Sequence, residues 1–151
     1  MARRLIAKVD LQGKKIKGKL ADWIKKHPGE LYFDSMIEWD VWDYITTNKV
    51  NAEYHKELLL FDSYDTSEYV PGTTTKSGKK TASSLKKTKQ RPIRYTPDYY
   101  LPDYDVYIEV KGYADEVFKL RWKLFKLKGY EGYLVYNRKD FIDVLKLLQK
   151  S

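Results

Sequence analysis

Hydrophobic and polar positions recur with regular periods along most of the chain, and these periods predict its helices and strands. Apolar residues three or four apart predict helices over 20–26, about 35–47 and 115–128, and a last helix after Asn137. Compact apolar runs and alternation with a period of two predict strands over 52–61, 93–101, 105–111 and 133–136. Counted from the helix at 35–47, the order is α-β-insert-β-β-α-β-α.

Two segments do not follow these periods. Residues 1–19 are basic with only scattered apolar positions, and we interpret them as an arm that orders on a partner. Residues 62–91 are rich in Ser, Thr, Lys and Gly, and a stretch of this length without clear structure is usually functional or disordered. The sequence therefore predicts one domain over 20–151 that carries a basic flexible insert at about 62–91.

The periods also predict which side chains face the core. In the strand 105–111 the apolar side chains share one face, which leaves Glu109 and Lys111 side by side on the other. In the helix 115–128 the stripe expected to face the core consists of Val117, Leu120, Leu124 and Leu127, widened by Phe118, Trp122 and Phe125.

Composition limits the classes of protein that remain. The 151 residues are 42% hydrophobic and 33% charged, which suits one soluble globular domain. Cysteine is absent, which excludes a disulfide scaffold, a Cys-ligated zinc site and a thiol nucleophile. The two histidines, His27 and His55, leave little room for a His-based metal site or for His-centred catalysis, and His55 is expected to be structural. No apolar run approaches a membrane span and no signal-peptide core is present, so we expect a cytoplasmic protein with no membrane partner.

Positive charge is concentrated in two segments. Residues 1–26 hold nine basic and two acidic residues, and residues 76–94 hold eight basic residues and no acid, within a chain of net charge +8. This asymmetry favours a nucleic-acid partner, although basic loops can also serve solubility alone. The residues expected to contact nucleic acid are Arg3, Arg4, Lys14, Lys15, Lys79, Lys80, Lys86, Lys87, Lys89, Arg91 and Arg94.

Candidate chemistry gathers in the segment TPDYYLPDYDVYIEVKGY, residues 96–113. Asp98 begins one strand of a predicted hairpin, and antiparallel pairing can bring it to the same rim as Glu109 and Lys111. Two neighbouring carboxylates repel unless a cation lies between them, and oxygen ligands favour Mg²⁺ or Mn²⁺. A lysine beside such an ion can stabilise transition-state charge or act on an attacking water. The alternative is a surface hairpin with a Glu-x-Lys pair and a turn aspartate.

These residues resemble a known family. Pro97-Asp98 followed by Glu109-Val110-Lys111 is similar to the PD-(D/E)XK nuclease signature. Within that superfamily, the sequence around the motif most resembles small phage endonucleases of the endonuclease I type, which resolve Holliday junctions. Phe33 to Glu38 (F-D-S-x-x-E) and Arg91 to Tyr95 (R-P-I-x-Y) are similar to flanking motifs of phage nucleases. The resemblance implies an α/β fold of mixed α+β type, with a restriction-endonuclease-like αβββαβ core over about 33–136 and helices flanking a mixed central sheet.

The resemblance also implies the roles of site residues. Asp98, Glu109 and the backbone carbonyl of Val110 would hold Mg²⁺, which Mn²⁺ can replace. Lys111 would be the catalytic lysine, and Glu38 would reach a second metal or a metal-bound water.

The function implied is a metal-dependent DNA endonuclease, acting on branched DNA in a bacterial host cell. A homodimer would follow because two opposed strands need two sites. The basic insert has no counterpart in the family and bears on substrate choice, so a nickase of the same fold is an alternative to a resolvase. A second alternative is a module in which a nuclease-like fold only binds nucleic acid.

Overall fold

The computed structural model describes residues 8–151, which form two compact units. The main unit comprises residues up to 56 together with 96–151, and the hairpin unit comprises Glu57–Tyr95. The helices described are α1 (Leu20–Lys26), α2 (Met36–Thr47), α3 (Glu116–Leu127) and α4 (Arg138–Lys150). The strands of the main unit are β1 (Val9–Asp10), β2 (Tyr32–Phe33), β3 (Glu53–Tyr54), β8 (Tyr99–Leu101), β9 (Val106–Val110) and β10 (Gly132–Val135). The strands of the hairpin unit are β4 (Leu58–Phe61), β5 (Tyr64–Val70), β6 (Ser84–Gln90) and β7 (Ile93–Tyr95). The chain is thus a mixed α+β protein.

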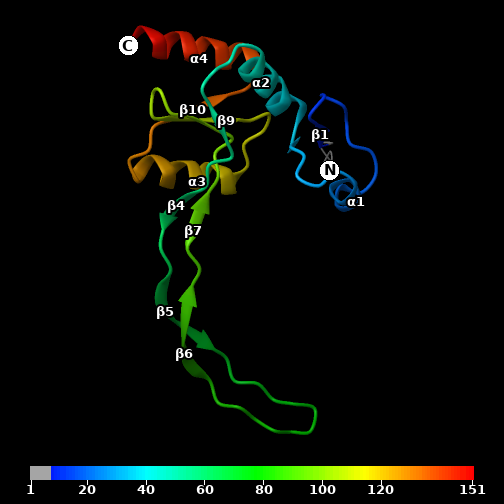
Figure 1. Cartoon of the computed structure of the whole chain (residues 1–151). Coiled ribbons are helices and arrows are strands. Elements are labelled where there is room, and N and C mark those ends of the chain that lie inside the picture. The colour runs from blue at the N-terminus through cyan, green and yellow to red at the C-terminus, as the bar shows by residue number, and fades with distance from the viewer. Residues whose placement is uncertain (1–7) are drawn as a thin grey trace. The chain divides into compact units, whose positions relative to one another are not determined.

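A mixed four-stranded sheet organises the main unit. Its strand order is β10-β9-β8-β3, in which β10 runs parallel to β9 and the other neighbours are antiparallel. Helices α2 and α4 lie on one side of this sheet and α3 on the other (Figure 1). The core includes Val41 of α2, Ile108 of β9 and Phe141 of α4. Every residue of β9 is therefore buried, because the strand is central and both its faces are covered.

Burial of both faces corrects the predicted orientation of β9. The alternation predicts one apolar face packed on a core and an opposite face carrying Glu109, but Tyr107 and Glu109 are also buried. The Phe125 ring of α3 packs edge-on against Tyr107, with 5.6 Å between ring centroids. A period of two reports alternation along a strand and cannot report a second layer on the polar side.

The predicted core face of α3 is wrong. Val117, Leu120 and Leu127 are 58%, 59% and 79% exposed, whereas Phe118 and Phe125 are buried. Of the residues expected only to widen the stripe, Phe118 and Phe125 form the buried face, and the half-buried Trp122 stacks on Phe125 with 4.9 Å between ring centroids. Large aromatic side chains remove more apolar area from water than leucine does, which explains why they take the inner positions.

Helix starts agree with the sequence. The Ser35 hydroxyl caps α2 by accepting a hydrogen bond from Glu38 N at 3.2 Å. Asp115 caps α3 and Asn137 caps α4 in the same way. Ser, Asp and Asn are common helix caps because they satisfy amide groups that the first helical turn leaves unpaired.

Two predicted strands are each broken in the structure. Residues 52–61 form β3 and β4, separated at His55, whose φ of 56° lies in the left-handed region. Residues 93–101 form β7 and β8, separated at Pro97, which has no amide hydrogen to donate to a sheet. His55 N donates to Asp98 O at 2.9 Å, so the two breaks are hydrogen-bonded to each other.

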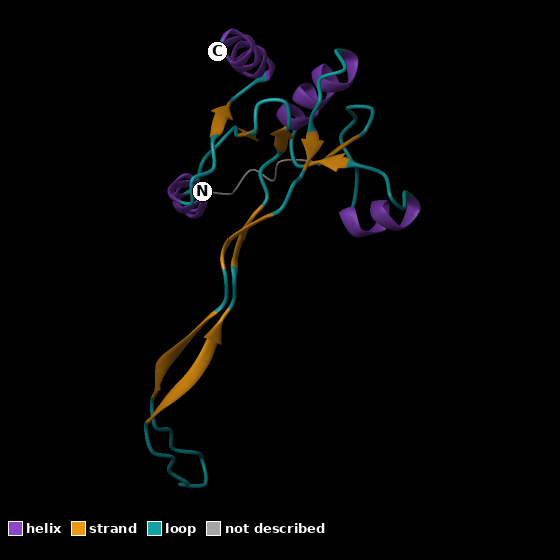
Figure 2. Ribbon diagram, turned by 60° about the vertical axis from the view of Figure 1, so that its left-hand side comes forward, coloured by secondary structure: helices purple, strands orange, loops and turns teal. Residues whose placement is uncertain are grey.

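The predicted flexible insert contains regular structure. Strands β5 and β6 pair antiparallel over seven residues each, from Tyr64↔Gln90 to Val70↔Ser84 (Figure 2). Beyond them, an isolated bridge joins Thr74 to Lys80 near the tip of the hairpin. Strand β4 pairs antiparallel with β7 in the same unit.

The predicted N-terminal arm is partly paired. Val9 of β1 is buried and lies opposite Phe33 of β2 in an antiparallel pair. Trp39 of α2 also donates a ring hydrogen bond to Leu11 O at 2.9 Å. The described part of the arm thus packs on the main unit, whereas Arg3 and Arg4 lie outside the described residues.

Candidate functional site

Asp98 and Glu109 face each other across the pair β8–β9. The Asp98 carboxylate accepts a hydrogen bond from Val110 N at 2.7 Å, and Asp98 N donates to the Glu109 carboxylate at 3.3 Å. Asp98 is 6% exposed and Glu109 is 5% exposed. The antiparallel register therefore places the Asp98 and Glu109 carboxylates together, as the hairpin pattern predicted, and it also buries them beside the backbone of Val110.

Lys111 lies just beyond the end of β9. Its ammonium is 3.3 Å from the Glu109 carboxylate and 4.4 Å from the centroid of the Phe118 ring of α3. Its backbone amide donates to Val135 O of β10 at 3.0 Å. Because its side chain is 28% exposed, the ammonium is fixed beside the carboxylates and still accessible to solvent.

Glu38 reaches the same site from α2. The segment Ser35 to Glu38 has the spacing of a capping box, and the Glu38 carboxylate accepts from Asp34 N at 3.2 Å. Glu38 is 7% exposed, and its backbone carbonyl accepts a hydrogen bond from the Tyr99 hydroxyl at 2.9 Å. Local capping and a contact with β8 therefore hold this acid in place.

The site carries excess negative charge. Burial, followed by the charges of Asp98, Asp34 and Glu109, raises the pKa of Glu38 from 4.5 to about 8. A carboxyl whose neighbours are also acidic ionises reluctantly unless a cation compensates the charge. The chemistry of this donor set therefore fits a divalent cation, which would favour the ionised form.

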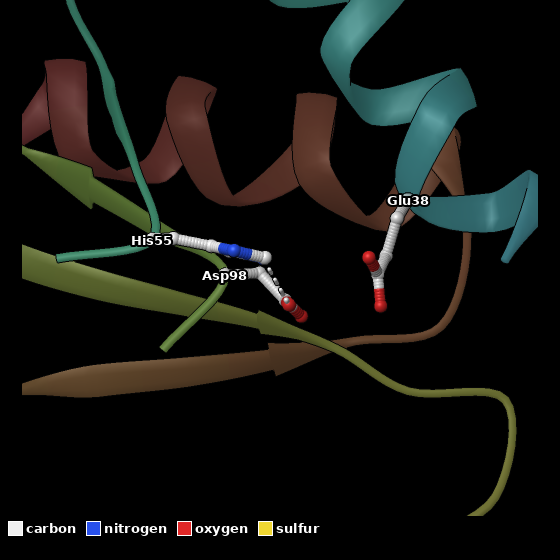
Figure 3. A group of neighbouring side chains, drawn as sticks. All are labelled: Glu38, His55 and Asp98. Atoms are coloured by element: carbon white, nitrogen blue, oxygen red, sulfur yellow. Dashed lines mark ion pairs between the residues drawn. The ribbon is translucent and has the colours of Figure 1, made fainter. Parts of the chain in front are cut away.

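Sequence reasoning missed His55 as a member of the site. His55 Nε2 is 3.8 Å from Asp98 Oδ1, and one ligand atom each from Glu38, His55 and Asp98 lie within 4.8 Å of one another. Figure 3 shows Glu38 facing the pair His55–Asp98 from α2. No motif spacing connects His55 with Asp98, and the break in the predicted strand 52–61 left no trace in the hydrophobic pattern.

The predicted nucleic-acid contacts lie in both units. Lys14 and Lys15 follow β1, and Lys79 and Lys80 lie near the hairpin tip. Lys86, Lys87 and Lys89 belong to β6, and Arg91 lies between β6 and β7. Arg94 of β7 forms an ion pair with Glu57 at 2.8 Å, which offsets its charge.

Comparison with protein-family models, with curated proteins and with solved structures found no match. Among residues 8–151, no helix is long and apolar enough to cross a membrane.

Proposed function

We propose that this protein is a divalent-metal-dependent endonuclease that hydrolyses DNA phosphodiester bonds. The observation that carries the proposal is the convergence of Glu38, Asp98 and Glu109, all buried, with the Lys111 ammonium beside them. The order α2-β3-β8-β9-α3-β10 also agrees with the αβββαβ order implied by the PD-(D/E)XK resemblance. Buried acids without a compensating cation destabilise a fold, so their presence favours a functional reason.

Asp98 and Glu109, with the Val110 carbonyl and Glu38, would hold Mg²⁺ or Mn²⁺. A bound ion of this kind polarises a phosphoryl oxygen and lowers the pKa of bound water. The Val110 amide and the Asp98 amide each donate to a carboxylate of the pair, which fixes the orientation of both acids before any ion binds. Such preorganisation lowers the cost of assembling the site.

Lys111 is the residue that would face the scissile phosphate. Its contact with Glu109 and its position over the Phe118 ring keep the ammonium oriented. A cation there stabilises negative charge that develops on the phosphate oxygens during attack by water.

The hairpin unit supplies the DNA-binding surface in this proposal. The register places Lys87 opposite Ser67, whereas Lys86 lies opposite Glu68 and Lys89 opposite Asp65. Lysines of β6 and of the tip would contact phosphates, and a two-stranded ribbon is an element that the major groove of DNA admits. Preference for branched DNA and assembly as a homodimer, both taken from the family resemblance, are part of the same proposal.

Cleavage of a labelled four-way junction and of its linear duplex tests the proposal. The wild type and two variants, Asp98→Asn and Asp103→Asn, would be assayed with Mg²⁺, with Mn²⁺ and with a chelator. Asp103 is a matched control because it is an exposed acid on the turn of the same hairpin, bound to Asn51.

We expect metal-dependent cleavage that Asp98→Asn abolishes and Asp103→Asn preserves. The ratio of junction to duplex cleavage separates a resolvase from a nickase. DNA binding without cleavage of either substrate, in either metal, would contradict the proposal and favour the non-catalytic binding module.

A further inference from the structure

His55 has no part in the chemistry proposed above, although its ring lies in the site. Its Nε2 atom is 3.8 Å from Asp98 Oδ1, on the side of the carboxylate that does not receive the Val110 amide. Glu38 contributes an oxygen to the same space (Figure 3). An imidazole and two buried carboxylates are a common set of ligands for a divalent transition-metal ion.

The ring of His55 is held in place before any ligand arrives. It stacks on Tyr54 with 3.6 Å between ring centroids, and its backbone amide donates to Asp98 O. Its φ of 56° is uncommon for a residue other than glycine and needs support from the surrounding structure. A side chain fixed in this way loses little conformational entropy on binding an ion.

The distances suit a shared ion. Two ligands that are each about 2.1 Å from one metal can be up to about 4.2 Å apart. The separation of 3.8 Å between His55 Nε2 and Asp98 Oδ1 meets this limit, and one ligand atom each from Glu38, His55 and Asp98 lie within 4.8 Å of one another. His55 and Asp34 also line a cavity of about 230 Å³.

We propose that His55 Nε2 is a ligand of a divalent cation shared with Glu38 and Asp98, and that it makes the site bind Mn²⁺ more tightly than Mg²⁺. The proton of the neutral ring then resides on Nδ1. Nitrogen ligands suit transition-metal ions, whereas Mg²⁺ prefers oxygen. The importance of this preference for catalysis rests on the proposed nuclease function, but binding of the ion itself does not.

The test uses tag-free protein with Mn²⁺ or Mg²⁺ and no DNA. Electron spin-echo spectroscopy of bound Mn²⁺ detects a coordinated imidazole nitrogen, and calorimetry gives both affinities. The variant is His55→Asn, because asparagine tolerates the left-handed conformation. The control is His27→Asn, the other histidine of the chain, which likewise stacks on an aromatic ring, that of Trp23.

In the wild type and in His27→Asn, we expect a magnetic coupling between Mn²⁺ and an imidazole nitrogen (below, the nitrogen coupling). This coupling should be lost in His55→Asn. Mn²⁺ binding should weaken about tenfold or more in His55→Asn, with a smaller effect on Mg²⁺. Mn²⁺ bound without a nitrogen coupling, no Mn²⁺ binding, or equal affinities in the two variants would each overturn the inference. If His55→Asn fails to fold, the wild type and His27→Asn still decide, because a coupling kept in His27→Asn leaves His55 as the sole imidazole.

Failure of this inference is distinguishable from failure of the nuclease proposal. Metal-dependent DNA cleavage without a nitrogen coupling would overturn the role of His55 alone. A nitrogen coupling in a protein that cleaves neither DNA substrate would support His55 as a ligand and overturn the proposed activity.

Discussion

At the scale of the residue, Glu38 connects the site with the stability of the protein. Burial, followed by the charge of Asp98, raises the pKa of its carboxyl from 4.5 to about 8 in the folded chain. Between these values the folded state binds more protons, so the free energy of unfolding falls as pH rises. An ionised Glu38 carboxylate destabilises the folded protein, and a bound proton removes this effect. By our proposal, a bound metal ion does the same.

We therefore predict that the chelated wild type loses more thermal stability between about pH 5 and pH 8 than Glu38→Gln does. The neutral amide has no proton to lose in this window. Melting temperatures followed by circular dichroism across the pH range, with chelator present, measure the difference. Parallel pH profiles for the two proteins would contradict the raised pKa. Adding Mn²⁺ at the upper pH should stabilise the wild type more than the variant.

Lys111 gives a second prediction at this scale. Lys111→Ala should abolish cleavage and leave DNA affinity nearly unchanged, because one ammonium beside the acids acts on the reacting phosphate rather than on the surrounding backbone. Paired cleavage and binding assays measure both quantities. Lys119→Ala is the control, since Lys119 pairs with Glu116 on the exposed side of α3. Full cleavage by Lys111→Ala would exclude the assigned role.

At the scale of the element, β6 is the strand whose charge can be tested directly. Changing Lys86, Lys87 and Lys89 to glutamine should reduce the slope of log K against log salt by about two to three, since each phosphate contact contributes roughly 0.9. A control with the same charge change replaces Lys139, Lys146 and Lys150 of α4. A slope reduced equally by both sets would exclude a specific role for the hairpin.

Elements also show where sequence patterns succeed and fail. The starts of α2, α3 and α4 were predictable because each cap is a local contact between residues three apart. The inner face of α3 was not predictable, because Phe118 and Phe125 compete with the leucine stripe and only the neighbouring aromatic rings decide between them. The insert was misjudged since β5 and β6 lack an apolar face and alternate weakly.

At the scale of the whole molecule, the two units should be separable. Among the described residues, the members of the hydrophobic core cluster all belong to the main unit. Replacing residues 64–90 with a short Gly-rich turn should leave a cooperative melting transition and unchanged Mn²⁺ affinity, and it should weaken DNA binding. Calorimetry measures the Mn²⁺ affinity, and a salt titration measures DNA binding. Loss of metal binding in a folded variant would show that the hairpin supports the site.

The sequence by itself determined the pair of Asp98 with Glu109 and the nearby Lys111. All three belong to one hairpin, and its short turn sets the register that brings them together. The resemblance to a nuclease family added Glu38 through its F-D-S-x-x-E motif. Without that resemblance, Glu38 stands at the edge of a helical stripe and would be read as a cap.

Only the tertiary structure decided how these residues are buried and what else joins them. Both faces of β9 are covered because α2 and α4 pack on one side of the sheet and α3 on the other, and the hydrophobic period of a strand does not indicate a second layer on its polar face. His55 enters the site through a backbone hydrogen bond between two strand breaks, a contact that no local pattern encodes. Burial by these long-range contacts raises the pKa of Glu38, so the charge balance of the site is a property of the fold.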